Sequence, residues 1–379
     1  QDLDQRRAAR LYRHRRILQS PQAARIVLDG RTCTNFSSND YLGLASDPRV
    51  LAAFKRGAET YGVGSGASHL VSGHSAEHHA LEEELAAFTG RQRALLFSTG
   101  YMANIGAVVA LLQRGDYIIE DKLNHASLLD AGQLSGARLQ RFAHNDMAAL
   151  QQRLASSRDA ARKLIAVDGV FSMDGDCAPL PALVALANTH RAWLMVDDAN
   201  GFGILGKDGA GLLQMGGFGE DEVPVLMATF GKALGTFGAF VAGSELLIET
   251  LIQRARTYIY TTALPPAVAA ATRESLRIVQ AESWRRERLQ ALVARLRSGI
   301  EALGMALMPS DTAIQPLLLG DAASALRLSE KLYRQGFFVP AIRPPTVPRN
   351  TARLRITVTA AHTEADIERL LQALERCAP

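Results

Sequence analysis

The stretch VDDANGFGILG (residues 196–206) ends an apolar run with two adjacent acids and then continues into a glycine-spaced loop. A carboxylate beside a buried strand needs a cation or several hydrogen-bond donors, because burying it unpaired costs several kcal/mol. In open α/β sheets, ligands bind beyond the carboxyl ends of the strands. The stretch therefore predicts a buried strand whose end, at Asp197 and Asp198, faces a positively charged group.

Short apolar runs bounded by turns surround this stretch, and they do not alternate between apolar and polar residues. Such runs, separated by helix-like segments, are typical of strands that are covered on both faces. They predict an α/β fold with a large mixed, mostly parallel sheet. The expected strands are residues 93–100, 117–121, 163–172, 193–199, 224–230 and 238–243.

Helical patterns occupy other parts of the chain. Residues 75–90 predict a helix with an N-cap serine and a final glycine. In the last quarter of the chain, an amphipathic helix over 289–303 precedes a half-exposed strand over 353–360 and a further helix. We expect an N-terminal helical segment (1–45), a large domain (46–285) and a smaller C-terminal α/β domain (286–379).

The composition is that of an ordinary globular protein, with 47% hydrophobic and 21% charged residues among 379. Much of the net charge of +4 comes from RRAARLYRHRR (residues 6–16), which is either a solvated helix face or a contact for an anionic substrate and gives little support to nucleic-acid binding. No apolar run reaches the roughly 18 residues of a membrane span and no signal-peptide pattern is present, so we expect a cytoplasmic protein. Cys33, Cys177 and Cys377 lie far apart, which indicates neither a disulfide framework nor a zinc site.

The segment GFGILG (residues 201–206) matches the G-x-G-x-x-G pattern of dinucleotide-binding folds. Its context argues against that function, because the glycines are followed by GKDGAG rather than by a helix whose N-terminus could receive a pyrophosphate. A nicotinamide oxidoreductase rests on this motif alone and is the weaker alternative.

The next predicted strand ends in TFGKALGTFG (residues 229–238), which places Thr229 and Lys232 in a glycine-rich turn. A lysine among apolar and glycine neighbours can have a lowered pKa and act as a nucleophile, although an isolated lysine is more often a surface residue. Pyridoxal phosphate (PLP) requires an amine, an acid beside its pyridinium nitrogen, and hydroxyls or backbone amides for its phosphate. Lys232, Asp197 and Thr229 meet these requirements in separate strand-end segments.

Other strand ends fit the same ligand. In FSTGYMAN (residues 97–104), a strand runs into Gly100 before an expected helix, which forms an anion-binding N-terminus beside Tyr101. His125 follows another strand and either stacks on a cofactor ring or satisfies local hydrogen bonds. Ser172 likewise lies between a predicted strand and a turn.

Over nearly its whole length the chain resembles the α-oxoamine synthases, which are PLP enzymes of the aspartate-aminotransferase fold type, fold type I. The segments FAHND and IRPPTVP are typical of the branch of this family that uses L-alanine and a pimeloyl thioester. The resemblance is carried by NFSSNDYLGL (35–44), GVGSGASHLVSG (62–73), LNHASLLDA (123–131), FAHNDM (142–147), GVFSMDGD (169–176), VDDANGFG (196–203), TFGKALG (229–235) and IRPPTVP (342–348).

The resemblance implies PLP as the cofactor, with Lys232 as its Schiff-base lysine, Asp197 beside the pyridinium nitrogen and His125 stacked on the ring. Family members are homodimers with active sites at the interface, and a hydroxyl from YTTALPP, here Thr262, reaches the partner's phosphate. The remaining implied cofactor contacts come from Gly100, Tyr101, Ser172, Asn200 and Thr229.

For the substrates, the resemblance implies that Arg13 and Thr346 contribute to binding and that Arg355 receives the amino-acid carboxylate, as suits its bidentate fork. Asn39, Ser68 and His125 are implied to line the substrate site. The implied reaction condenses L-alanine with a pimeloyl thioester of coenzyme A or acyl carrier protein and releases carbon dioxide. Use of glycine or serine, as in other family members, stays open as an alternative.

One position departs from the family pattern, because the motif reads DDAH and Asn200 takes the place of the histidine. An asparagine amide can donate a hydrogen bond to the cofactor's phenolic oxygen, but it cannot carry a charge or relay a proton. We therefore expect cofactor binding to survive with an altered protonation state and rate. A homologue that only binds the cofactor is the further alternative.

Overall fold

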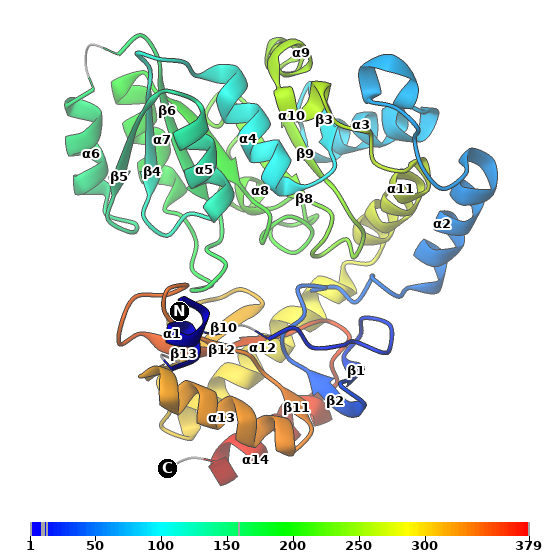
Figure 1. The fold of residues 1–379 in the computed structure, drawn as a ribbon, viewed down its shortest axis with the longest axis vertical. Helices are drawn as coiled ribbons and strands as arrows, with labels where there is room; N and C mark the ends of the chain where they lie inside the picture. The colour runs from blue at the N-terminus through cyan, green and yellow to red at the C-terminus, as the bar shows by residue number, and fades with distance from the viewer. Residues whose placement is uncertain (1, 9–11, 13, 158–159, 378–379) are drawn as a thin grey trace. The chain divides into compact units, whose positions relative to one another are not determined.

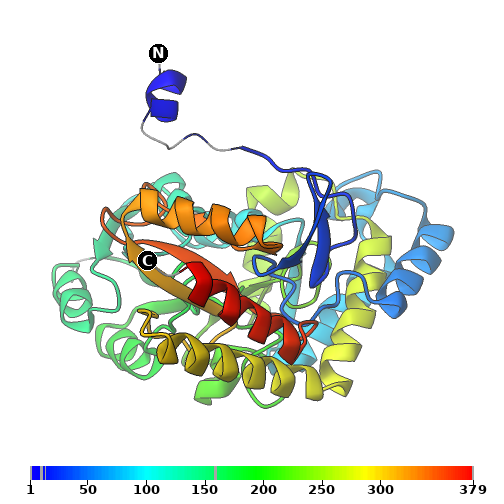
Figure 2. The same cartoon turned by 90° about the horizontal axis from the view of Figure 1, so that it is seen from below.

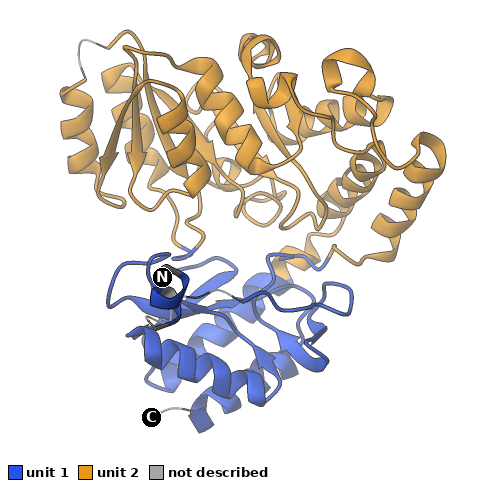
Figure 3. Cartoon of the chain, viewed as in Figure 1, with its two compact units in different colours: residues 1–43, 173–175, 288–379 blue, residues 44–172, 176–287 orange. Residues whose placement is uncertain are grey.

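The computed structural model of the chain describes residues 2–8, 12, 14–157 and 160–377. The chain divides into two compact units, shown separately by colour in Figure 3. Unit 1 comprises Gln1–Gly43, Met173–Gly175 and Arg288–Pro379, and unit 2 comprises Leu44–Ser172 and Asp176–Glu287. Within the described residues, no helix is both long and apolar enough to cross a membrane.

Unit 2 is built around a seven-stranded sheet with the strand order β3-β9-β8-β7-β6-β4-β5. Strand β9 is antiparallel to both of its neighbours, and the other pairings in this sheet are parallel. Helices cover both faces of the sheet (Figure 1), which confirms the predicted α/β fold. The strands are β3 (Arg93–Phe97), β4 (Tyr117–Asp121), β5 (Arg138–Phe142), β6 (Lys163–Asp168), β7 (Trp193–Asp197), β8 (Val225–Thr229) and β9 (Ala239–Gly243).

The helices of unit 2 bury mainly small and aliphatic side chains against the sheet. Helix α4 is the most apolar example, with Ala103, Ala107 and Val108 fully buried. Helix α3 has the predicted N-cap serine, Ser75, and ends at Gly90 in the left-handed region. The helices are α2 (Pro48–Tyr61), η1 (His69–Gly73), α3 (Ala76–Thr89), α4 (Gly100–Leu111), α5 (Ala126–Leu134), α6 (Met147–Ala155), α7 (Leu180–His190), α8 (Leu212–Gly216), α9 (Glu245–Arg254), α10 (Arg256–Ile259) and α11 (Pro266–Ala281).

A short loop over residues 230–238 joins β8 to its antiparallel neighbour β9. The Phe230 amide donates to the Gly238 carbonyl oxygen at 2.9 Å, and the Thr236 amide donates to the Phe230 carbonyl oxygen at 3.0 Å. This loop therefore lies at the edge of the sheet where β8 and its parallel neighbour β7 end.

Unit 1 contains two three-stranded sheets, ordered β1-β2-β11 and β10-β13-β12. Helices α13 and α14 lie side by side in Figure 2 and contact each other. The boundary between the units falls inside α12, whose later residues belong to unit 1. The elements are α1 (Asp2–Ala8), β1 (Arg25–Leu28), β2 (Arg31–Asn35), α12 (Trp284–Ala302), β10 (Ile314–Gly320), α13 (Ala322–Arg334), β11 (Phe337–Phe338), β12 (Ala341–Ile342), β13 (Ala352–Thr357) and α14 (Glu364–Cys377).

The segment 1–45, which the sequence predicted to be helical, holds the short helix α1 and also the antiparallel pair β1 and β2. The turn between these strands is Asp29–Gly30, and both residues have positive φ, 50° and 76°. An Asp-Gly pair with that geometry is the preferred two-residue hairpin turn. Ile26 and Leu28, at alternate positions of β1, are buried.

Strand β13 was expected to be half-exposed, but all six of its residues are buried. It is the central strand of its sheet, so both edges are paired. Its alternate arginines have polar partners, because Arg353 forms an ion pair of 2.7 Å with Asp174 and Arg355 donates to Asn39 at 3.2 Å. The polar residues that suggested exposure are thus buried with hydrogen-bonding partners.

Candidate active site

A cavity of about 180 Å³ lies in unit 2 at the edge of the sheet where β6, β7 and β8 end. The N-terminus of α4 reaches the same edge, because β3 and β8 are both antiparallel to β9 and their carboxyl ends lie together. The cavity is lined by Gly100, Tyr101, Asn104, His125, Ser127, Asp168, Ser172, Asp197, Ala199, Asn200, Met227, Thr229 and Lys232.

Asp197, the last residue of β7, is held in place by two neutral donors. Asn104 Nδ2 donates to Asp197 Oδ2 at 2.7 Å, and the Ala199 amide donates to Oδ1 at 3.0 Å. The side chain lies in the lining of the cavity and is nearly fully buried. The carboxylate therefore has a fixed orientation from which it can face a cationic ligand.

His125 is the N-cap residue of α5, and its ring borders the cavity. Its amide donates to both carboxylate oxygens of Asp168, at 3.0 and 3.1 Å, and its Nδ1 lies 2.7 Å from the Ser127 hydroxyl. Desolvation by the surrounding protein lowers the pKa of His125, the charge of Asp197 opposes this shift, and the charge of Lys232 adds to it. The imidazole is therefore neutral near pH 7.

Lys232 lies in the turn between β8 and β9 and lines the cavity with Thr229. The Thr229 hydroxyl donates to the Gly238 carbonyl oxygen at 2.8 Å. A phosphate offers acceptors at pH 7, so Thr229 could donate to one only by giving up this bond within the turn. Thr229 reaches the predicted place, and its hydrogen bond stabilises the segment that carries Lys232.

Three lining residues with polar side chains, Asn104, Ser127 and Asp168, are absent from the sequence predictions. Asp168 ends β6 and pairs across the sheet with Asp197, so the strand-end rule that identified Asp197 applies to it equally. Burial and the neighbouring charge of Asp197 raise the pKa of Asp168 well above its ordinary value, against the opposing effects of the His125 amide and Lys232. Asn104 lies inside the apolar helix α4, and a polar residue at such a position was the sequence signal that could have identified it as a site residue.

Asp198 does not line the cavity and instead organises the glycine-rich loop after β7. The Leu212 amide donates to its Oδ2 at 2.6 Å, and burial is the largest effect that raises its pKa to about 8. A Cβ atom on Gly201 would lie 2.1 Å from Asp198 Oδ1, and one on Gly211 would lie 2.0 Å from Oδ2. These glycines therefore allow the loop to close around a carboxyl group, which gives Gly201 of the dinucleotide-like motif a structural role.

The remaining predicted cofactor residues on this edge have identifiable contacts. Tyr101 lies edge-on to His125, with ring centroids 6.3 Å apart, and its hydroxyl bonds to Asp130. The amides of Gly100 and Tyr101 open α4, where a helix cannot satisfy its own donors. Asn200 is buried and its Nδ2 donates to the Val170 carbonyl oxygen at 3.1 Å.

Two predicted residues of unit 2 do not line this cavity. Thr262 is exposed, and its carbonyl oxygen accepts a 3.4 Å hydrogen bond from Ser98 Oγ. Ser68 immediately precedes η1, and its carbonyl oxygen accepts a hydrogen bond of 2.9 Å from the Gly73 amide. Neither side chain is among those that enclose the cavity.

Unit 1 brings two of the predicted substrate residues together. Arg355 is buried on β13 and donates to Asn39 Oδ1 at 3.2 Å and to Thr357 Oγ1 at 3.0 Å. Burial raises the pKa of Tyr41, and Arg355 opposes this shift. These two neutral acceptors help to hold the Arg355 guanidinium in place.

Thr346 is exposed in the IRPPT segment of unit 1 and borders a separate cavity of about 450 Å³. Tyr12 and His14 line the same cavity, and Arg343 donates to the Tyr12 carbonyl oxygen at 3.1 Å. Arg13, the predicted arginine between these two, lies outside the residues that the structure describes.

A cluster of three histidines near η1 offers ring nitrogens close enough to share a metal ion, but its hydrogen bonds favour a structural role. His78 accepts from the Ser75 amide through Nδ1 at 2.9 Å, and its Nε2 lies 2.7 Å from the Leu264 carbonyl oxygen. One ring nitrogen of His78 is therefore used in capping α3 and the other bonds to the chain at Leu264. His69 Nδ1 and His74 Nδ1 lie 3.0 Å apart and bond to each other.

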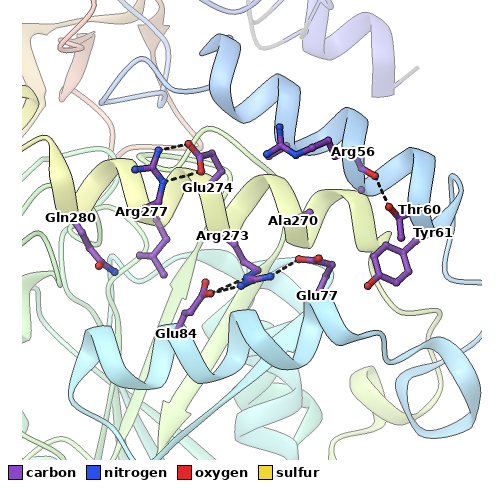
Figure 4. Close-up of a pocket in the computed structure, with 13 residues that line it drawn as sticks. Arg56, Thr60, Tyr61, Glu77, Glu84, Ala270, Arg273, Glu274, Arg277 and Gln280 are labelled. Carbon is purple, nitrogen blue, oxygen red and sulfur yellow. Dashed lines mark hydrogen bonds and ion pairs between the residues drawn. The ribbon is translucent and has the colours of Figure 1, made fainter.

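A larger cavity of about 530 Å³ lies between α2, α3 and α11, and Figure 4 shows its lining. Arg273 forms ion pairs of 2.7 Å with both Glu77 and Glu84, and Arg277 pairs with Glu274 at 2.6 Å. The charges on its walls thus neutralise one another. It contains none of the residues predicted for catalysis or cofactor binding.

The cavity at the sheet edge fits PLP on the chemistry of its donor set. Lys232 supplies the amine, Asp197 supplies a buried carboxylate held by neutral donors, and the first turn of α4 supplies amides that its own helix leaves unpaired. These groups come from β7, β8 and α4, whose ends meet at one edge. The groups present therefore match the chemical requirements of the cofactor.

Comparison with known proteins agrees with this assignment. The profile of the family described as "Aminotransferase class I and II" matches residues 31–374. The chain is 62% identical over 375 residues to the 8-amino-7-oxononanoate synthase of Thioalkalivibrio sulfidiphilus, covering 99% of this chain and 96% of that protein. It is 63% identical over 368 residues to the enzyme of the same name from Methylococcus capsulatus, covering 97% and 95%. A solved structure of SPT with a PLP internal aldimine has a TM-score of 0.93 at 34% identity, covering 96% of this chain and 92% of that chain.

Proposed function

The chain belongs to the class I and II aminotransferase family, and we propose that it condenses L-alanine with a pimeloyl thioester to give 8-amino-7-oxononanoate in biotin biosynthesis. It is a PLP-dependent acyltransferase, as the sequence predicted. The observation that carries the proposal is that Lys232, Asp197 and His125 line one cavity in a chain 62% identical to a synthase of that product. The shared name of these relatives supports alanine, rather than glycine or serine, as the amino-acid substrate.

In this reaction the α carbon of alanine bonds to the thioester carbonyl carbon and the thiolate leaves. The carboxylate then departs as carbon dioxide, and a proton returns to the α carbon. Bound PLP supplies the electron sink that stabilises negative charge on that carbon. Lys232 Nζ holds the cofactor and then accepts the α proton, and the Asp197 carboxylate favours the protonated ring nitrogen.

Residues around the ring orient the cofactor. With the cofactor bound, the neutral imidazole of His125, which lines the cavity, would stack on its ring and help to orient the bond that breaks. The amides of Gly100 and Tyr101 receive the phosphate at the N-terminus of α4. Ser172, which follows β6, and Thr229, which ends β8, would contact the cofactor from the strands on either side of β7.

The substrate contacts fall to unit 1 and to Ser68. Arg355, held by Asn39 and Thr357, receives the alanine carboxylate through its planar fork. Arg13 and Thr346 bind the acyl substrate, and the neighbours of Arg13 border the same cavity as Thr346. Either the coenzyme A or the carrier-protein thioester would supply the anionic groups that suit these residues.

The proposed assembly is a cytoplasmic homodimer in which Thr262 of one subunit contacts the phosphate bound by the other. The exposure of Thr262 supports this arrangement, because its side chain is accessible to a second subunit. The three cysteines are free, which suits a reducing compartment. A membrane or nucleic-acid partner has no role in the proposal.

The test is to supply the purified chain with PLP, pimeloyl-coenzyme A and one amino acid at a time. We expect 8-amino-7-oxononanoate, free coenzyme A and carbon dioxide with L-alanine, measured by mass spectrometry and thiol release. Comparable product formation from glycine or serine instead would keep the family and overturn the substrate. A chain that takes up PLP but forms no product with any of them would support the alternative of a cofactor-binding homologue.

A further inference from the structure

A buried chain of hydrogen bonds connects Asp197 to His125 through two residues that line the cavity, Asn104 and Ser127. Asn104 Nδ2 lies 2.7 Å from Asp197 Oδ2 and 2.8 Å from Ser127 Oγ. Ser127 Oγ in turn lies 2.7 Å from His125 Nδ1. The two residues come from α4 and α5, which pack closely against each other.

The direction of each hydrogen bond follows from the carboxylate at one end. Asn104 must present its NH₂ group to Asp197, because the opposite orientation would place its carbonyl oxygen against a carboxylate oxygen. The second hydrogen of that NH₂ group then points to Ser127 Oγ, which accepts it. The Ser127 amide, 3.3 Å away, donates to His125 Nδ1, which must therefore carry a lone pair, and the Ser127 hydroxyl donates its own hydrogen to the same atom.

His125 Nδ1 is thus an acceptor, so the ring proton of the neutral imidazole resides on Nε2. Protonation of Nδ1 would place its hydrogen against that of the Ser127 amide and would require the Ser127 hydroxyl to change from donor to acceptor. The geometry opposes the charged imidazolium even though Asp197 lies nearby.

Burial indicates that Asn104 and Ser127 serve this chain of bonds rather than the surface of a helix. Asn104 is 0% exposed and Ser127 is 1% exposed. Asn104 Oδ1 is buried and, among the described residues, has no hydrogen-bond partner, which destabilises the fold. The Ser127 side chain does not cap α5, because the capping group is the His125 side chain, which accepts from the Ser127 amide.

We propose that Asn104 and Ser127 are positioning residues that fix the orientation of Asp197 and select the Nε2–H tautomer of His125. For its effect on catalysis this inference rests on the proposed function, whereas the tautomer is a property of the protein itself. The consequence for the reaction is that the ring-facing imidazole stays uncharged while Asp197 stays directed at the cofactor nitrogen.

The experiment uses the full chain labelled with ¹⁵N at histidine, with and without PLP, and long-range proton–nitrogen correlation spectra. The His125 signals are assigned among the nine histidines by their loss in His125→Gln. The variants are Ser127→Ala, Ser127→Thr, Asn104→Asp and, as a matched control, Ser135→Ala. Ser135 is a buried hydroxyl at the other end of α5 that donates to the Gly132 carbonyl oxygen at 2.8 Å and does not touch His125.

We expect a single Nε2–H tautomer in the wild type, in Ser127→Thr and in Ser135→Ala from about pH 6 to about pH 9, a range that spans the ordinary titration of histidine. In Ser127→Ala only the longer hydrogen bond from the backbone amide of residue 127 remains on Nδ1, so the Nδ1–H tautomer should become detectable and His125 should titrate at a higher pH. The same variant should lose about tenfold in kcat, with little change in the KM for pimeloyl-coenzyme A. In Asn104→Asp, PLP affinity measured by absorbance should fall by about tenfold or more.

An unchanged tautomer and titration in Ser127→Ala, or equal changes in Ser135→Ala, would overturn the inference. Failure of the proposed function looks different. A wild type that holds His125 in the Nε2–H form but makes no product would refute the function and leave the inference standing. A wild type that makes product with His125 in the other tautomer would refute the inference alone.

Discussion

Two of the cavities in unit 2, the one at the sheet edge and the larger one between α2, α3 and α11, have opposite character. In the cavity at the sheet edge, Asp197 accepts hydrogen bonds from two neutral amide donors, so its charge is not neutralised by those donors. In the larger cavity of Figure 4, Glu77 and Glu84 both pair with Arg273. The difference teaches that volume does not identify a site here. Carboxylates held by neutral donors stay available to a cationic ligand, whereas ion-paired ones do not.

The sharpest break in this comparison is Lys232→Ala, which removes the amine from the smaller cavity. Turnover should fall by at least about 10³-fold, because loss of a nucleophile that also acts as the base removes two functions at once. Rates of 8-amino-7-oxononanoate formation measure the effect. Lys207→Ala, on an exposed position of the neighbouring loop, is the control and should keep its rate. Equal rates in both variants would remove Lys232 from the mechanism.

Asp197→Asn keeps the shape of the side chain and removes its charge. We expect kcat to fall by about 10²-fold and PLP to bind more weakly, because the ring nitrogen would lose its anionic partner. Absorbance titration with PLP and steady-state kinetics measure the two effects. A variant with wild-type kcat would show that neutral hydrogen bonding at this position suffices.

Asn200→His tests the one departure from the family pattern inside the same cavity. An imidazole can carry charge where an amide cannot, so the pH dependence of the bound-cofactor absorbance should shift and turnover should change by up to about tenfold. Spectra and turnover recorded across pH measure both. Identical spectra and identical rates would show that Asn200 has no influence on protonation at the cofactor.

The two cavities should also differ in how pH affects stability. The pKa of Asp198, next to the smaller cavity, is raised to about 8, so the folded state holds a proton that the unfolded state releases near pH 4, its ordinary range. The free energy of unfolding should therefore fall as pH rises through this window, by about 1 kcal/mol per pH unit at most. Asp198→Asn should flatten that slope in denaturant unfolding measured at several pH values.

At the larger cavity the sign is opposite. Arg277 lowers the pKa of Glu274, mainly through its hydrogen bond, so the stabilising contribution is present above the ordinary pKa of a glutamate and is lost as pH falls. Glu274→Gln should reduce the acid sensitivity and leave the slope toward pH 8 unchanged. The same slope change in Glu274→Gln and Asp198→Asn would contradict the contrast between the two regions.

The smallest expected effect is that of Arg273→Gln. Its ion pairs with Glu77 and Glu84 are partly exposed to solvent, so the free energy of unfolding should fall by about 1 kcal/mol or less. Turnover should stay at the wild-type value. A substantial loss of turnover with unchanged stability would instead make the larger cavity part of the reaction.

Apolar runs made most of the central sheet predictable from the sequence, because strands covered on both faces leave no polar alternation. Strand β5 escaped this rule because it is an edge strand, and only Phe142 among its residues is buried. The β1 and β2 pair was missed because its signal is the Asp29–Gly30 turn rather than an apolar run. The burial of β13 was misjudged because Arg353 and Arg355 look exposed until their partners are known.

For the candidate site, the strand-end rule was sufficient to identify Asp197 and Thr229, and it extends to Asp168. That rule could not identify Asn104, because Asn104 lies inside a helix. Its role becomes clear only once α4 is placed against β7 and α5, where Asn104 bonds to Asp197 and Ser127. Thr262 and Ser68 stay predictions, because their roles depend on groups that the cavity itself does not contain.

The antiparallel direction of β9 also determines how Lys232 is tethered. Because β9 returns beside β8, the segment that carries Lys232 begins and ends at the same edge of the sheet. Hydrogen bonds from Thr229 and Phe230 to Gly238 hold its two ends together. In each proposed catalytic cycle the amine must leave the cofactor and later reattach to it. A tether of this kind keeps the effective molarity of the amine high during that interval, so its return is an intramolecular event at every turnover.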